Sequence, residues 1–177
     1  AATRFSVRTL VARRDLAARG TAVALDRRGE LTVAWIEQAS DAGRLHGPKV
    51  VRAAYRTLAG RWSGAQAVGR SSAFNYATPR LAATPDGTVA LTYNTRSGSS
   101  PGVAAAWRSR GRAFGAVQPV PTGRQQLLDP TLGADPDGRV WLTGTTGCTG
   151  PGGDVVVAVA PPGRRRFTGR TRPVPAA

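Results

Sequence analysis

Hydrophobic and polar positions follow the same order in three stretches of the chain. Each stretch has a short apolar run, a turn that ends in glycine, and a run in which apolar residues alternate with other residues. The three copies are Val23–Trp35, Leu81–Tyr93 and Leu132–Gly144. An apolar period of two is typical of a strand that is buried on one face. Each copy therefore predicts a β-hairpin.

The turn inside each hairpin has a defined chemistry. Asp135-Pro-Asp-Gly138 places Asp first, Pro second and Gly fourth, as a type I turn prefers. Thr84-Pro-Asp-Gly87 is nearly the same, and Asp26-Arg-Arg-Gly29 keeps only the two ends. Because turn chemistry alone accounts for these aspartates, they are interpreted as structural residues and not as metal ligands.

A second phrase follows each hairpin: a Val/Ala-rich strand, a turn with Gly and Arg, an aromatic residue and another short strand. The aromatic anchors are Trp62, Phe114 and Phe167. The residues seven positions before them are Tyr55, Trp107 and Ala160. The unit has four strands and recurs about every fifty residues, as β-propeller blades do. The predicted fold class is therefore all-β, with three complete four-stranded antiparallel blades.

The beginning of the chain fits the same repeat. Arg4-Phe-Ser-Val7 resembles Arg61-Trp-Ser-Gly64, so an outer strand without its own blade is expected there. The predicted divisions of the single propeller segment, 1–177, are an orphan strand at 1–12 and blades at 20–69, 79–120 and 130–175. Closed propellers usually have at least four blades. Either the chain is part of a larger propeller or two chains form a six-bladed ring, and isolated blade sides would expose apolar patches.

The net charge of +15 bears on the class of partner. The arginines are spread through every blade and the aromatic residues fall mostly on repeat positions, which disfavours nucleic acid. A positive field still attracts anionic polymers. The densest basic run, Arg164–Arg166, is interpreted as a solvated turn.

Cysteine content and hydropathy bear on chemistry and compartment. Cys148 is the only cysteine, which excludes an internal disulfide and a cysteine-based metal cluster. As a catalytic thiol it would need a histidine, and His46 lies two blades away in the repeat. No run approaches the length of a transmembrane segment, and Ala1–Thr3 would suit a terminus left by signal cleavage. These features predict a secreted or cell-surface protein without a cofactor or metal.

Two phrases of the repeat resemble a known group of β-propeller repeats. Pro79–Leu91, which reads Pro-x-Leu-Ala-x-x-Pro-Asp-Gly-x-Val-x-Leu, and Gly111–Gly115 are similar to the sialidase-like (BNR or Asp-box-like) β-propeller repeats of secreted bacterial proteins. The Asp-box is degenerate here: Thr57–Trp62 and Ser109–Phe114 keep Ser/Thr, Gly and the aromatic residue but lack Asp. The resemblance implies a fold, and proteins with such repeats have many functions.

The resemblance does not carry a catalytic site over to this chain. A sialidase needs an arginine cluster, an acid/base Asp and a Tyr nucleophile activated by Glu. Here the glutamates are Glu30, beside a turn glycine, and Glu37, at a strand end, while Tyr55 and Tyr93 fall on core positions of the repeat. No catalytic residue is assigned, and a role other than catalysis is favoured.

Loop positions predict where a ligand would bind, because loops vary while the blades fix their position. Aromatic, amide and carboxylate groups together are the usual equipment for sugar recognition, and Asn75 and Tyr76 are expected beside Asn94 and Arg96. The predicted ligand-binding residues are Asp15, Glu37, Asn75, Tyr76, Asn94, Arg96 and Asp129.

The favoured function is a non-catalytic, secreted β-propeller module that binds glycans or another extracellular polymer. One alternative is a fragment of a sialidase-like glycoside hydrolase whose catalytic residues lie mostly in missing blades. Another is a structural or protein-interaction propeller. The expected partners are a glycan or anionic extracellular polymer, and the remaining blades or a second copy of the chain.

Overall fold

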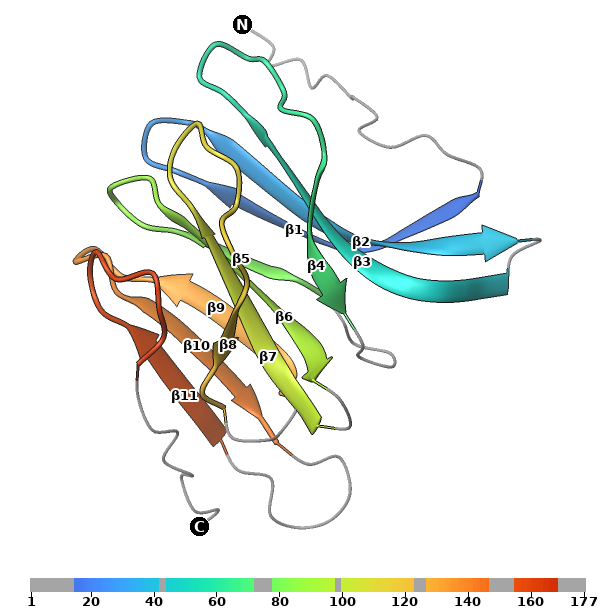
Figure 1. Ribbon diagram of the computed structural model, residues 1–177. Coiled ribbons are helices and arrows are strands. Elements are labelled where there is room, and N and C mark those ends of the chain that lie inside the picture. Colours follow the sequence, from blue (N-terminus) through green and yellow to red (C-terminus); the bar gives the residue numbers. More distant parts are fainter. Residues whose placement is uncertain are drawn as a thin grey trace, which may run out of the picture.

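A computed structural model describes residues 15–41, 44–71, 78–97, 100–122, 127–146 and 155–168. Within these residues every regular element is a β-strand, and the strands form three antiparallel sheets (Figure 1). No helix in this part of the chain is long and apolar enough to cross a membrane. The predicted all-β fold class is confirmed, whereas the orphan strand expected at 1–12 lies outside the described residues.

Each sheet is a meander in which every strand lies beside the next strand along the chain. The first sheet contains β1 (Leu16–Leu25), β2 (Leu31–Asp41), β3 (Arg44–Arg56) and β4 (Gln66–Ser71). The second contains β5 (Arg80–Ala83), β6 (Val89–Ser97), β7 (Ser100–Arg108) and β8 (Gln118–Val120). The third contains β9 (Leu128–Ala134), β10 (Val140–Thr145) and β11 (Val155–Ala160).

The count of three complete four-stranded blades stays a prediction. Where a fourth strand of the third sheet would begin, the described residues show an isolated bridge between Val159 and Thr168. The blade limits predicted from the repeat also stay predictions.

The three predicted hairpin turns are present. Their glycine amides donate to the carbonyl oxygen three residues earlier: Gly29 to Asp26, Gly87 to Thr84 and Gly138 to Asp135, at 2.9, 2.9 and 3.0 Å. These glycines have φ angles of 91°, 84° and 87°, in the left-handed region that other residues rarely adopt. The repeated turn glycine is therefore a backbone requirement.

The sheets pack face to face in chain order, and two apolar cores lie between them (Figure 1). The core between the first and second sheets includes Ala34, Ile36, Val51, Leu91, Tyr93 and Ala106. The core between the second and third includes Ala90, Val103, Trp107, Leu142, Val156 and Phe167. The first strands of the sheets, β1, β5 and β9, contact one another in that order. This arrangement is that of neighbouring blades in a propeller.

The register of the third sheet differs from the prediction. Each third strand has one residue that pairs with the third residue after the turn glycine. In the first two sheets this residue is Tyr55 and Trp107. In the third sheet it is Val159, whereas alignment of the repeat on Phe167 predicts Ala160. The loop that leads to Phe167 has one residue more than its counterparts, so counting back from the aromatic anchor shifts the third copy.

The outer faces of the first and third sheets carry exposed apolar side chains. Val23 and Leu25, which flank the buried Ala24 in β1, are 63% and 64% exposed. At the other end of the stack, Trp141 and Val155 are 41% and 39% exposed. The two ends of the stack thus present apolar sheet faces, as expected for blade sides without a neighbouring blade.

Candidate functional site

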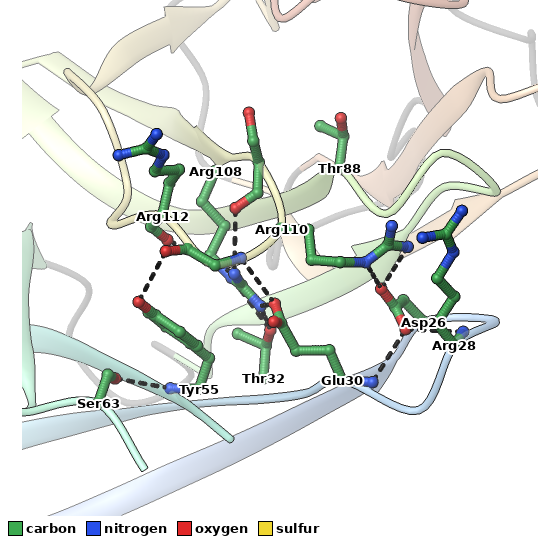
Figure 2. Close-up of polar contacts among 12 residues, drawn as sticks. Asp26, Arg28, Glu30, Thr32, Tyr55, Ser63, Thr88, Arg108, Arg110 and Arg112 are labelled. Carbon is green, nitrogen blue, oxygen red and sulfur yellow. Dashed lines mark hydrogen bonds and ion pairs between the residues drawn. The ribbon is translucent and has the colours of Figure 1, made fainter. Parts of the chain in front are cut away.

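A buried ion pair connects the first and second sheets. Arg108, at the end of β7, donates from Nη2 to Glu30 Oε1 at 2.6 Å and from Nε to Thr32 Oγ1 at 3.1 Å. The side chains of Arg108 and Glu30 are 1% and 4% exposed. The guanidinium also lies over the ring of Tyr55, 4.4 Å from its centroid (Figure 2). Burial of this charge is tolerated because each of these groups compensates part of its lost hydration.

A second polar contact crosses the same interface through the turn between β1 and β2. Asp26 Oδ1 accepts the backbone N–H groups of Arg28 and Glu30, both at 2.9 Å. Its Oδ2 accepts Arg110 Nε at 2.7 Å (Figure 2). Burial would raise the pKa of Asp26, but the Glu30 amide, the Arg110 guanidinium and the Arg28 amide outweigh it and hold the pKa below its ordinary value. Asp26 therefore acts as an ionised structural residue.

Asp26→Asn is expected to destabilise the protein at pH 7, and the difference from the unchanged protein should shrink on acidification. Because the fold lowers the pKa of Asp26, its ionised form contributes stability above the unfolded-state pKa of about 3.9. That contribution is lost as the pH falls through the lower, folded-state pKa. Urea unfolding at pH 7, 5 and 3 would measure it, and a difference that is constant over this range would contradict the assignment.

Two of the predicted ligand-binding residues already have partners inside the protein. Glu37, in β2, accepts Trp35 Nε1 at 2.9 Å and pairs with Arg52 Nε at 2.8 Å. Asn94, in β6, is 1% exposed and donates from Nδ2 to the Leu127 carbonyl oxygen at 2.8 Å. These two residues lie in different sheets, and their described contacts are internal.

The other predicted ligand-binding residues are spread over the chain. Asp15 is exposed just before β1, and its backbone oxygen accepts the amide of Ser40 at 2.9 Å. Arg96 and Asp129 lie in β6 and β9, but their side chains are outside the described part of the structure. Asn75 and Tyr76 are outside the described residues altogether. The expected cluster around Tyr76 thus stays a prediction.

Two hollows lie between the second and third sheets. One is a cavity of about 270 Å³ at the turn between β5 and β6, next to the loop after β11. Its polar and aromatic lining includes Asp86, Thr88, Trp107, Asp137, Arg164 and Arg165. The other is a more open groove of about 850 Å³ between β8 and the same loop, lined among others by Gln118, Pro119, Arg164, Arg165 and Arg166. We call them the inter-sheet cavity and the basic groove.

The basic groove is strongly positive. Arg164, Arg165 and Arg166 are exposed, and within the described ranges no carboxylate forms an ion pair with them. Arg165 Nη2 donates to Ser109 Oγ at 2.5 Å, so this arginine links the loop after β11 to the second sheet. The sequence interpretation of these arginines as a solvated turn missed the groove, because its other wall comes from a sheet distant in sequence.

Asp86, in the inter-sheet cavity, is an acceptor rather than an acid. Burial would raise the pKa of Asp86, but hydrogen bonds from the Thr84 hydroxyl and from Thr88 outweigh it and hold the pKa below its ordinary value. Asp137 forms an ion pair with Arg139 at 2.7 Å. A general acid for glycoside cleavage needs a raised pKa, so Asp86 suits binding better than catalysis.

No family model and no curated protein matches the chain. Among solved structures, the Hadza microbial sialidase Hz136 matches with a TM-score of 0.58 and 13% identity, over 90% of this chain and 34% of that protein. A levansucrase from Bacillus subtilis, solved in complex with oligosaccharides, matches with a TM-score of 0.51 and 11% identity, over 98% and 61%. A Dyadobacter fermentans protein of unknown function has a TM-score of 0.44 at 11% identity, over 88% and 69%.

The matches to the sialidase and to the levansucrase show a likeness of fold, at identities too low to show more. They agree with the propeller-like packing of the three sheets and with the fold that the repeat resemblance implies. The chain spans about a third of the length of the sialidase and less than two thirds of the levansucrase.

Proposed function

We propose that the chain is a non-catalytic, propeller-like module that binds an acidic glycan or another anionic extracellular polymer in the basic groove. The observation that carries this proposal is the groove itself, where three consecutive exposed arginines have no described carboxylate partner. A secreted or cell-surface location fits such a ligand.

The shape of the groove supports a polymer rather than a small, enclosed ligand. Its volume of about 850 Å³ lies on the open edge of the second sheet, beside the three-residue outer strand β8. Arginine guanidinium groups donate in pairs to planar carboxylates, so a row of them suits a chain with regularly spaced acidic groups. The matched levansucrase was solved with oligosaccharides, which makes a sugar polymer a reasonable first probe.

A fragment of a glycoside hydrolase is the second candidate, because the chain superposes on a third of a sialidase. On this alternative the acid and the nucleophile would come from blades outside this chain. Purified chain that cleaves no sialoside or fructan but binds acidic polymer would favour the binding module.

The basic groove can be tested with polygalacturonate, using dextran as the neutral polymer. We expect the 177-residue protein to bind polygalacturonate but not dextran, with an affinity that falls as salt is raised. Arg164→Gln/Arg166→Gln should weaken binding by about tenfold or more at low salt, or about 1.4 kcal/mol. Fluorescence anisotropy of labelled polymer measures both effects.

The matched control is Arg27→Gln/Arg28→Gln, which removes the same charge from the exposed turn between β1 and β2. It should change the affinity by much less, because Arg27 and Arg28 do not line the groove. Equal loss in the two double variants would mean that only net charge matters and would reject the groove.

A further inference from the structure

Equivalent positions of the repeat build the two interfaces between sheets, but only one interface is filled. Between the first and second sheets, the guanidinium groups of Arg108 and Arg110 occupy the space beside the β1–β2 turn (Figure 2). Ala160 of the third sheet is the repeat equivalent of Arg108 of the second sheet, because each residue pairs with the second residue after the turn glycine of its own sheet. The turn hydrogen bonds similarly make Pro162 the equivalent of Arg110.

The facing residues change together with the arginines. Asp26 and Glu30, which receive the two guanidinium groups in the first sheet, correspond to Thr84 and Thr88 in the second. Two long cations and two carboxylates are thus replaced by shorter, uncharged side chains. The inter-sheet cavity of about 270 Å³ lies where those groups would have been, and it has room for about one sugar ring.

Trp107, one of the residues that line this cavity, carries an unpartnered buried group. The residue is 4% exposed, and its Nε1–H has no hydrogen-bond acceptor among the described residues. Its equivalent in the filled interface, Tyr55, donates its hydroxyl to the Gly111 carbonyl oxygen at 3.0 Å. Buried donors are almost always paired in folded proteins, so the indole N–H is available to donate to an acceptor supplied from outside the chain.

The charges around the cavity narrow the chemistry of that ligand. Arg164 and Arg165 attract a negative group and disfavour a cation. Asp86 and Asp137 also line the space; Thr88 and Arg139 already donate to them, and their remaining lone pairs can accept hydroxyl donors of a ligand, which a bare inorganic anion such as phosphate supplies poorly. A ligand with one carboxylate and several hydroxyl groups satisfies both requirements.

We propose that the inter-sheet cavity binds a single hexuronic acid residue, with its carboxylate on Arg164 and Arg165, an oxygen on the Trp107 indole N–H, and hydroxyls on Asp86 and Asp137. The inference rests on the proposed function, because it places one acidic sugar of the polymer next to the basic groove. Arg165 lines both the inter-sheet cavity and the basic groove, and its hydrogen bond to Ser109 holds its side chain in place.

The test follows indole N–H signals of ¹⁵N-labelled protein by NMR during titration with galacturonic acid, galactose or inorganic phosphate. The signal of Trp107 is identified by its absence from Trp107→Phe, a variant that keeps an aromatic ring beside Phe167. We expect galacturonic acid to shift this signal and galactose and phosphate to leave it in place. Arg164→Gln should weaken galacturonic acid binding about tenfold, and Trp107→Phe should weaken it measurably by calorimetry.

Arg166→Gln separates this inference from the proposed function, because Arg166 lines the groove and not the cavity. It should weaken polygalacturonate binding and leave galacturonic acid binding unchanged. If the polymer binds but the monosaccharide does not shift the Trp107 signal, the cavity assignment is wrong and the groove stands. Equal shifts with galactose or phosphate would also overturn it, and failure of the polymer to bind would reject the proposed function itself.

Discussion

Glu30→Ala is expected to lower the free energy of unfolding by about 3–5 kcal/mol, which is a large part of the stability of a small domain. The variant leaves Arg108 buried between two sheets without its carboxylate, while its contacts with Thr32 and Tyr55 are too weak to compensate. Urea unfolding followed by circular dichroism would measure the change at pH 7.

The matched control is Asp137→Ala, which removes one partner of the exposed pair with Arg139 and should cost less than about 1 kcal/mol. The double variant Glu30→Leu/Arg108→Met should be less destabilised than the sum of its single variants, because it leaves no unpaired charge. A Glu30→Ala variant as stable as the Asp137→Ala control would show that water reaches Arg108 and that the interface does not depend on the pair.

Much of the fold could be predicted because its causes are local. Alternating apolar residues and turn glycines with positive φ act over a few residues, so the hairpins around Gly29, Gly87 and Gly138 are visible in the sequence. Tyr93 was expected in the core; it is 2% exposed, and burial raises its pKa to about 12. The packing of successive blades then followed from the repeat.

The features that could not be predicted depend on residues far apart in the chain. Glu30 and Arg108 are separated by 78 positions, and nothing near Glu30 in the sequence indicates a buried cation. The sequence alone indicates only that Glu30 lies beside a turn glycine. The sequence signal for a buried cation is a difference between copies of the repeat. The second copy has Arg108 after an aromatic residue, and the third copy has Ala160 at the equivalent position. The extra loop residue before Phe167 concealed that difference.

The predicted ligand-binding residues stay a prediction, and they do not include the arginines of the basic groove. Loop position and residue type predict ligand binding at Glu37 and Asn94, yet both side chains bond to groups inside the protein. Hydrogen-bond partners decide whether a polar side chain is free for a ligand, and those partners come from other strands. The arginines of the basic groove were visible as a run, but the opposite wall that makes them a groove was not.

The 177-residue chain is expected to self-associate at micromolar concentration through the outer faces of its first and third sheets. The second sheet packs one face against the first sheet, and Val23 and Leu25 lie on the corresponding face of the first sheet. The second sheet packs its other face against the third sheet, and Trp141 lies on the corresponding face of the third sheet. The two faces therefore complement each other, and burial of exposed apolar area drives a head-to-tail contact between copies.

Substitution on either face should break this contact. Val23→Glu/Leu25→Glu and Trp141→Glu/Val155→Glu are each expected to weaken association at least about 100-fold in sedimentation velocity, or about 2.7 kcal/mol. Val117→Glu, at an exposed valine in the loop before β8, is the control and should have little effect. Because each double variant keeps the opposite face intact, mixing the two should restore a heterodimer. A monomeric unchanged protein at high concentration would refute the contact, and variants that do not rescue each other would refute its head-to-tail geometry.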